Sequence, residues 1–300
     1  MGFSATDAAF EGFKVVRRHP MTIVFWSLLY IVTMVVGFAL AGPAVLRLVA
    51  QSEAMEAASS AGGQPSLADM QMIVQTWTAV LALAGPVSLI MGAVLSAAVA
   101  RAVVRPSESA FGYLRLGMDE LRVLVVSLVL GIAVYAVWIF GVIVTVALGV
   151  LAYTSGQPAL WIAVVLAGIA AVVATVWLTL RLCLAVPIVV HERRWAFADS
   201  FALTKGRVLP LLGMAIIAGV MFILVNLLGT IIAMPVQLIT AAGFNPAAFE
   251  GQSVVAILQA AWPAILGWIV IQSILAALQI AVLYAPFSAA YRDIKGLPHE

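Results

Sequence analysis

Long uninterrupted runs of apolar residues dominate the chain, and short polar stretches separate them. Six runs reach the roughly 20 residues that a helix needs to cross the hydrocarbon core of a bilayer. They cover about residues 22–47, 68–99, 122–151, 159–187, 208–238 and 263–290. Apolar residues follow one another without the alternation of a barrel strand, so the pattern predicts helices. We therefore expect an all-α integral membrane protein with six transmembrane helices.

A short phrase occurs three times, each time before a pair of these runs. Each copy holds an Ala-Phe pair, a second aromatic residue and basic residues nearby, and the copies start at Ala9, Ala110 and Ala196. The spacing predicts three repeated hairpins, each preceded by a cytosolic interfacial helix. The chain would then be a single membrane domain, 1–300, with repeat units of about 1–105, 106–192 and 193–300.

The middle copy shows why these helices are expected to be interfacial. Phe111, Leu114, Met118 and Leu121 recur at helical spacing and would share one face. A helix with such a face lies in the headgroup plane of a bilayer. The alternative is an ordinary connector packed on the helix bundle, and both interpretations place the segment on the cytosolic side.

The basic residues indicate the orientation. Of the 15 Lys and Arg residues, 14 fall at the two termini or at the second and fourth connections, and only Arg47 falls on the other side. The positive-inside rule puts the richer side in the cytoplasm. Both termini are then cytoplasmic, which requires an even number of spans, and six satisfies that requirement.

Composition supports the membrane class and excludes several others. The chain is 64% hydrophobic and only 9% charged, whereas soluble domains carry about 25% charged residues. A net charge of +2 is too small to predict a nucleic-acid partner. The hydrophobic composition instead makes membrane lipids the expected partners. The single cysteine, Cys183, excludes an internal disulfide and a cysteine-based metal cluster.

The pattern of titratable residues predicts no catalytic residue, no metal site and no cofactor. The interiors of the runs carry no acidic residue and no histidine, and the histidines lie apart, at His19, His191 and His299. His191-Glu192 is not followed by the second histidine of a zinc-protease helix, and the chain has no glycine-rich phosphate loop. We expect the protein not to be an enzyme. A weaker alternative is catalysis at the membrane face by His191, Glu192, Arg194 and Asp199.

Four polar residues within the runs are the candidate ligand-binding residues: Arg181, Asn226, Gln272 and Gln279. Arg181 lies near the end of the fourth run, where it would hold an anionic headgroup or else extend to the interface. Asn226 and Gln272 fall at similar depth in neighbouring antiparallel runs, so a hydrogen bond between them is expected. The alternative for the amides is polar contact between helices rather than a ligand site.

Glycine and proline positions predict bends and close packing. The candidate hinges are Gly85, Pro86, Pro187 and Pro286. Small residues four apart, such as Gly141 and Thr145 or Ala167 and Ala171, predict close approach of helices. Residues 51–66 are small and acidic and predict a flexible connection. Ser66 followed by Asp69 predicts a capping box at the start of the second span.

The second half of the chain holds an ordered set of residues that points to a family. The set is Pro187, Glu192, Ser200 and Leu-Thr-Lys-Gly-Arg at 203–207, closed by Tyr-Arg-Asp at 291–293. It resembles a bacterial superfamily that includes the membrane domain of some glycerophosphodiester phosphodiesterases and the YciC-like inner-membrane proteins. The resemblance implies a six-span protein of the bacterial inner membrane near lipid metabolism. It implies no catalytic residues, and the phosphodiesterase activity is not expected.

These features favour a protein that binds or moves a lipid or another amphipathic small molecule. The kinked second span, the aromatic and arginine-rich cytosolic collar and the polar residues of the last two runs motivate this prediction. The alternative is a non-catalytic membrane scaffold, whose collar would bind a protein partner.

Overall fold

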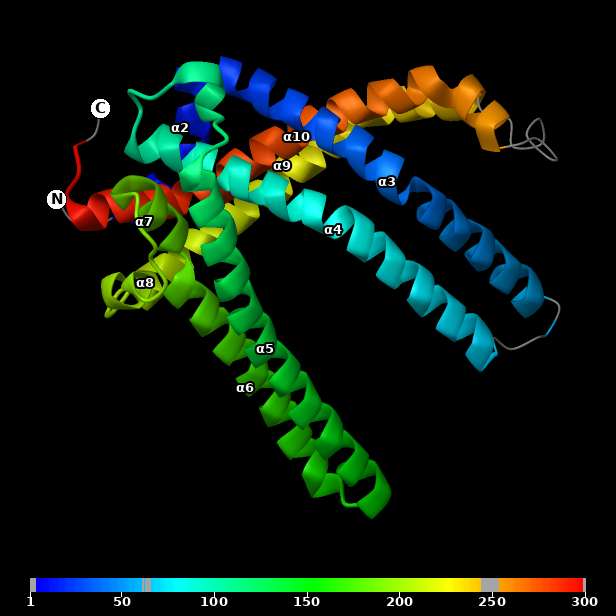
Figure 1. Ribbon diagram of the computed structural model, residues 1–300. Coiled ribbons are helices and arrows are strands. Elements are labelled where there is room, and N and C mark those ends of the chain that lie inside the picture. Colours follow the sequence, from blue (N-terminus) through cyan, green and yellow to red (C-terminus); the bar gives the residue numbers. More distant parts are fainter. Residues whose placement is uncertain (1–3, 61, 63–65, 244–253, 299–300) are drawn as a thin grey trace. The chain divides into compact units, whose positions relative to one another are not determined.

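The computed structural model describes residues 4–60, 62, 66–243 and 254–298, and these are helical almost throughout (Figure 1). The short helices are α1 (Ala5–Ala9), α2 (Glu11–Arg18), the 3-10 turn η1 (Ala110–Tyr113), α7 (Ala185–Glu192) and α8 (Asp199–Leu203). The long helices are α3 (Met21–Ser60), α4 (Leu67–Val104), α5 (Met118–Ser155), α6 (Pro158–Leu182), α9 (Val208–Gly243) and α10 (Val254–Lys295). Among the described residues there is no strand, so the predicted all-α class is confirmed.

Six helical stretches are long and apolar enough to cross a membrane. They are Met21–Ser60, Leu67–Val104, Ala110–Ser155, Pro158–Glu192, Val208–Pro235 and Leu266–Lys295. Each coincides with one of the six predicted runs, which confirms the predicted number of spans. Their large apolar side chains are mostly exposed, as at Ile143, Val172 and Ile232. This exposure suits a helix whose outer surface meets lipid instead of water.

The connection between α3 and α4 was predicted only in part. The expected flexible connection over 51–66 is wrong in its first part, because α3 continues to Ser60. The Ala and Glu residues of 53–58 are strong helix formers and extend the helix. The capping box is confirmed: the amide of Ser66 donates to Asp69 Oδ2 at 2.9 Å, and the amide of Asp69 donates to Ser66 Oγ at 3.2 Å.

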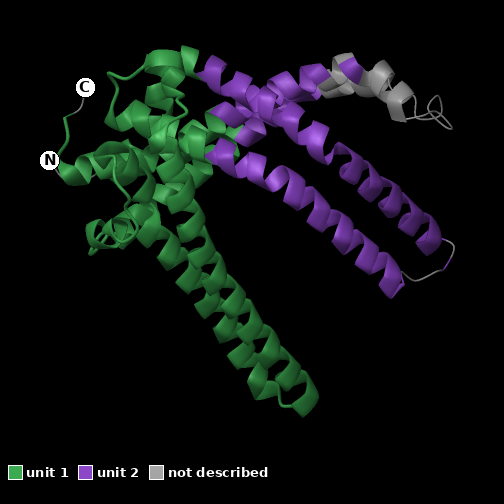
Figure 2. Ribbon diagram, in the orientation of Figure 1, with its two compact units in different colours: residues 1–22, 93–225, 278–300 green, residues 23–92, 226–277 purple. Residues whose placement is uncertain are grey.

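The chain forms two compact units, which are coloured separately in Figure 2. Unit 1 comprises Met1–Thr22, Ala93–Val225 and Leu278–Glu300, and unit 2 comprises Ile23–Gly92 and Asn226–Ala277. Each unit takes segments from more than one of the three predicted repeat units, whose boundaries stay a prediction.

Within unit 1, α5 and α6 form a hairpin that small residues hold close together. A side chain at Gly141 would collide with Cβ of Ala171, and one at Gly168 would lie 3.9 Å from Cγ2 of Thr145. The close approach predicted from these small residues is therefore confirmed. The turn uses Gly156 in the left-handed region, at φ 65°, and Pro158 opens α6.

A second close approach joins α2 to α10 in unit 1. A Cβ added to Gly12 would lie 2.5 Å from the carbonyl oxygen of Ala281. The glycine therefore lets the backbone of α2 rest directly on that of α10. In unit 2, Gly229 makes similar room on α9, because its Cβ would lie 2.5 Å from Cδ1 of Leu275 on α10.

The fourth predicted span is not one continuous helix. It stops at Leu182 and restarts at Ala185. Ser200 supports the interruption: its hydroxyl donates to the carbonyl of Arg181 at 2.7 Å and accepts from the amide of Leu184 at 3.2 Å. These bonds satisfy backbone groups that the break leaves without helical partners.

The segment before α5 also differs from its prediction. Only Ala110–Tyr113 forms a 3-10 turn, and Leu114 that follows is extended, so a single helical face through Leu121 does not form. Phe111 and Tyr113 have left-handed φ values of 51° and 65°. Such values are uncommon for residues other than glycine and require support from the surroundings.

Candidate functional site

Charged and hydrogen-bonding side chains from distant parts of unit 1 form a set of ion pairs and hydrogen bonds that we call the charged cluster. Its members come from α2, from the end of α4 to the start of α5, from the end of α7 and from the end of α10. They are Glu11, Arg101, Arg105, Glu108, Asp119, Glu120, His191, Glu192, Arg193, Tyr291, Arg292 and Lys295.

Arg101 is the most deeply buried charge of the cluster, with 1% of its surface exposed. Its guanidinium donates to the carboxylate of Glu120 and to the carbonyl of Tyr113. The second oxygen of Glu120 accepts from the amide of Gly117 at 3.0 Å. A buried charge needs such partners to offset the loss of hydration. The bond to Tyr113 also supports the left-handed backbone of η1.

Arg105 joins the α4–α5 connection to α7. It donates to the carbonyl of His191 at 2.8 Å and lies 3.5 Å from Asp119 and 3.7 Å from Glu108. Burial and the neighbouring Arg193 lower the pKa of the Arg105 guanidinium, while the two carboxylates oppose that shift. Glu108 also pairs with Arg193 at 3.0 Å, so the connection is attached to the end of α7 twice.

Tyr291 attaches α10 to the same end of α7. Its hydroxyl donates to Glu192 at 3.1 Å and lies 3.0 Å from Nδ1 of His191, which therefore acts as the donor to it. Glu192 also pairs with Lys295 at 3.1 Å and Arg194 at 2.7 Å. A carboxylate held by two cations and a hydroxyl serves as a structural acceptor. Among the described residues, no group of three or more His, Cys, Asp or Glu side chains is placed to hold a metal ion.

An apolar crevice of about 250 Å³ opens beside the interruption between α6 and α7. Its walls come from the unit 1 parts of α4, α5, α6, α7 and α10. Most of the lining is aliphatic or aromatic. The lining residues that carry a hydroxyl group are Ser96, Ser127, Thr179, Tyr284 and Ser288. Cys183, the only cysteine of the chain, also lines it. Apolar walls with a few polar groups are typical of small-molecule sites.

The four predicted ligand-binding residues differ in their surroundings. In unit 1, the guanidinium carbon of Arg181 lies 4.9 Å from the ring centre of Phe201 and 5.8 Å from that of Trp177. Gln279 is half-buried in the same unit. In unit 2, Asn226 and Gln272 are both exposed, and the described contacts include no hydrogen bond between their side chains.

The predicted hinges also fall into two groups. Helix α4 continues through Gly85 and Pro86, and α10 continues through the buried Pro286. Pro187 lies in the first turn of α7, directly after the interruption, and lines the crevice. A proline in a first helical turn removes no intrahelical hydrogen bond. The side chain of Ser200 instead bonds to the backbone on both sides of the interruption.

Sequence reasoning named His191 and Glu192 as a catalytic alternative, but it missed the other members of the charged cluster and the crevice. A signal for these other members was Arg101, a charge in the last turn of an apolar helix, with acidic residues following at Glu108 and Glu120. The comparison of the chain with family models, curated proteins and solved structures finds no match. The crevice and the charged cluster are therefore the grounds on which a function is inferred.

Proposed function

We propose that the chain is a six-span protein of the bacterial inner membrane that binds or moves a lipid or another amphipathic small molecule. The ligand would enter the apolar crevice beside the α6–α7 interruption. That crevice is the observation that carries the proposal. The distribution of Lys and Arg supports cytoplasmic termini, and the residues at 187–207 and 291–293 support membership of the YciC-like superfamily.

The chemistry of the crevice favours an amphipathic ligand. Leu130, Val134 and Phe287 supply apolar surface, which favours an acyl chain or a ring over a charged solute. Ser127 and Ser288 offer hydroxyl groups to an ester or alcohol oxygen. A volume of about 250 Å³ suits part of a lipid rather than a whole one. Arg181 directly precedes Leu182 and Cys183 of the lining, and its cation would attract an anionic headgroup.

The three-hairpin architecture belongs to the same proposal. Short segments, α2, η1 and α8, precede the first, third and fifth long helices along the chain. We infer that these segments lie at the cytoplasmic interface, where their aromatic residues would contact headgroups. Each repeat unit would then contribute one interfacial segment and one pair of spans.

A crevice-filling variant tests the proposal. Gly131 lines the crevice, and a Cβ there would have no neighbour within 4 Å, so the side chain of Gly131→Leu starts in open space and adds bulk at the crevice wall. Gly149→Leu is the matched control, because it changes the same helix at a glycine that also has open space. Mass spectrometry of the protein in native lipid discs should detect a retained amphipathic molecule. We expect Gly131→Leu to lose it and Gly149→Leu to keep it.

Accessibility of Cys183 gives a second measurement. A bound ligand should slow maleimide labelling of this thiol, because Cys183 lines the crevice. Delipidation should speed the labelling, and adding back the retained lipid should slow it again. If no amphipathic molecule is retained and labelling does not respond to lipid, the proposal is wrong.

A scaffold role is the second candidate, and one observation favours it. Trp195 and Phe197 follow α7, remain exposed and stack with ring centres 6.3 Å apart. The charged cluster orders the end of α7 from which they extend. Tryptophan is among the residue types that are enriched at the energetic centres of protein interfaces. A stoichiometric partner that is retained by the native chain and lost from Trp195→Ser would support this role over ligand binding.

A further inference from the structure

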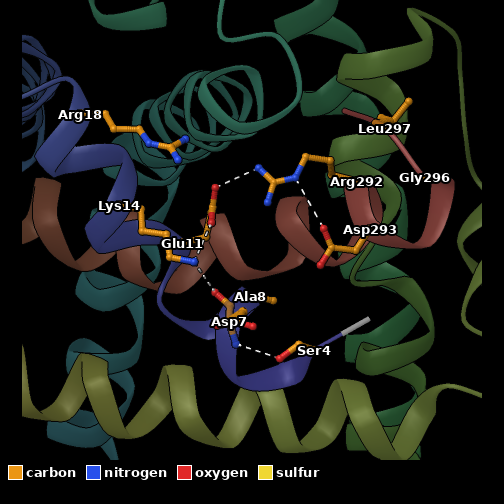
Figure 3. A pocket seen from close by; sticks show the side chains of 10 residues that line it. All are labelled: Ser4, Asp7, Ala8, Glu11, Lys14, Arg18, Arg292, Asp293, Gly296 and Leu297. Atoms are coloured by element: carbon orange, nitrogen blue, oxygen red, sulfur yellow. Dashed lines mark hydrogen bonds and ion pairs between the residues drawn. The ribbon is translucent and has the colours of Figure 1, made fainter. Parts of the chain in front are cut away.

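A second hollow lies in unit 1 between the N-terminal helices and the end of α10 (Figure 3). Its volume is about 510 Å³, within the roughly 300–1,000 Å³ that is typical of small-molecule sites. It is lined by side chains of α1, α2 and the residues that close α10. It shares no lining residue with the apolar crevice.

The lining of this hollow carries three cations and three carboxylates. They are Lys14, Arg18 and Arg292, and Asp7, Glu11 and Asp293. A ligand of a single charge would be attracted by half of these groups and repelled by the other half. A ligand that carries both signs can contact both sets, so the lining favours a zwitterion.

The buried ion pair between Glu11 and Arg292 forms part of the wall. Their side chains are joined at 2.9 Å, and the residues are 3% and 8% exposed. Among the described residues, the buried Nε of Arg292 donates no hydrogen bond, and Oδ1 of Asp293 lies 3.6 Å from it. Lys14 lies 3.6 Å from Glu11 and donates to the backbone carbonyl of Asp7 at 3.2 Å. The Arg292 guanidinium therefore lines the hollow with one N–H group that no acceptor among the described residues uses.

We propose that this hollow binds a small zwitterion that carries a phosphate and an ammonium group. Guanidinium groups match phosphate oxygens in geometry and charge, so Arg292 and Arg18 would bind the phosphate. Asp7 and Asp293 would bind the ammonium group. The same chemistry is present in free phosphoethanolamine and in a phosphatidylethanolamine headgroup. The site does not depend on ligand binding in the crevice.

Calorimetric titration of the full chain in phosphatidylglycerol discs tests the ligand class. The probes are phosphoethanolamine, inorganic phosphate and ethanolamine. We expect phosphoethanolamine to bind at least about tenfold more tightly than either single-charge probe, because it contacts both sets of groups. Equal binding of inorganic phosphate would overturn the zwitterion assignment, and no binding of any probe would overturn the site.

Variants of the exposed lining residues test the position of the site. Asp7→Asn removes a partner of the ammonium group, and Lys14→Gln removes a positive charge that lines the hollow beside the phosphate, so each should weaken phosphoethanolamine binding by about tenfold. Both residues are exposed, so both variants should still fold, and the thermal midpoint of each variant checks this. The matched controls are Glu53→Gln and Lys205→Gln, which change exposed charges elsewhere. Native-like binding by both Asp7→Asn and Lys14→Gln would overturn the proposal.

Hydrogen exchange of 5–14 separates the two sources of the ligand. Slower exchange in phosphatidylethanolamine discs than in phosphatidylglycerol discs would identify the lipid headgroup as the ligand. Slower exchange only on addition of phosphoethanolamine would identify the free molecule. Either result supports the site, and unchanged exchange in both experiments overturns it.

Discussion

Arg101 and Glu120 form an ion pair that is almost entirely buried in unit 1, with exposures of 1% and 6%. The pair connects the last turn of α4 to the first turn of α5. Removal of Arg101 leaves the carboxylate of Glu120 buried without its cation, whereas removal of both members leaves no uncompensated charge. The single variant should therefore lose more stability than the double variant, and this difference can be measured.

Arg101→Leu should destabilise the chain by about 3–5 kcal/mol, the usual cost of an uncompensated buried charge. The double variant Arg101→Leu/Glu120→Leu should recover more than half of that loss. Arg17→Leu is the control at an exposed arginine and should cost less than about 1 kcal/mol. Thermal unfolding in lipid discs gives the comparison. A double variant no more stable than Arg101→Leu would contradict the explanation.

Gly12→Ala should loosen α2 from α10. The new methyl group would lie 2.5 Å from the carbonyl oxygen of Ala281, so the two backbones must separate. Overpacking of this kind costs about 1–3 kcal/mol. Gly219→Ala has open space and should be neutral or stabilising, because alanine favours helix. Hydrogen exchange of α2 is the measurement, and equal exchange in both variants would show that the close approach is unimportant.

Ser200→Ala should destabilise the interruption between α6 and α7. The hydroxyl bonds to the backbones of both Arg181 and Leu184, and loss of buried hydrogen bonds costs about 1–3 kcal/mol. We expect a lower thermal midpoint and faster maleimide labelling of Cys183. Ser52→Ala, on an exposed part of α3, should change neither quantity. Native labelling kinetics in Ser200→Ala would argue that Ser200 does not hold the interruption.

Tyr291→Phe tests the attachment of α10 to α7. It keeps the buried ring and removes only the hydroxyl that contacts Glu192 and His191. The expected cost is about 1–2 kcal/mol of unfolding free energy. Tyr153→Phe, at a strongly exposed tyrosine, should have no effect. Chemical denaturation measures the free energy of unfolding of both variants. If Tyr291→Phe is as stable as the native chain, the hydroxyl contributes nothing to stability and only the buried ring does.

Local features of the structure were predictable from the sequence. A run of about 20 apolar residues is enough to define a span, and the six spans follow from it. The capping box of Ser66 and Asp69 involves residues three apart, so sequence alone specifies it. The contact of Gly141 with Ala171 follows from a short turn between two helices and from the spacing of small residues.

Long-range pairings were not predictable from one sequence. The positive-inside pattern placed Arg101 and Arg292 on the same side but assigned neither a partner. Arg292 pairs with Glu11, which precedes it by 281 positions, and no local periodicity encodes such a pairing. A contact between separate segments also explains why η1 differs from its prediction. The buried Arg101 donates to the carbonyl of Tyr113, and the backbone there forms a left-handed turn instead of a helix that continues through Leu121.

The pairing of Glu11 with Arg292 also sets an order of events during biosynthesis. Glu11 leaves the ribosome 281 residues ahead of its partner, so α2 must wait until α10 has been made. Every earlier helix is already available to the membrane by then. Closure of this pair is therefore a late step of maturation, and α2 can take its final place on α10 only after the last long helix has been made.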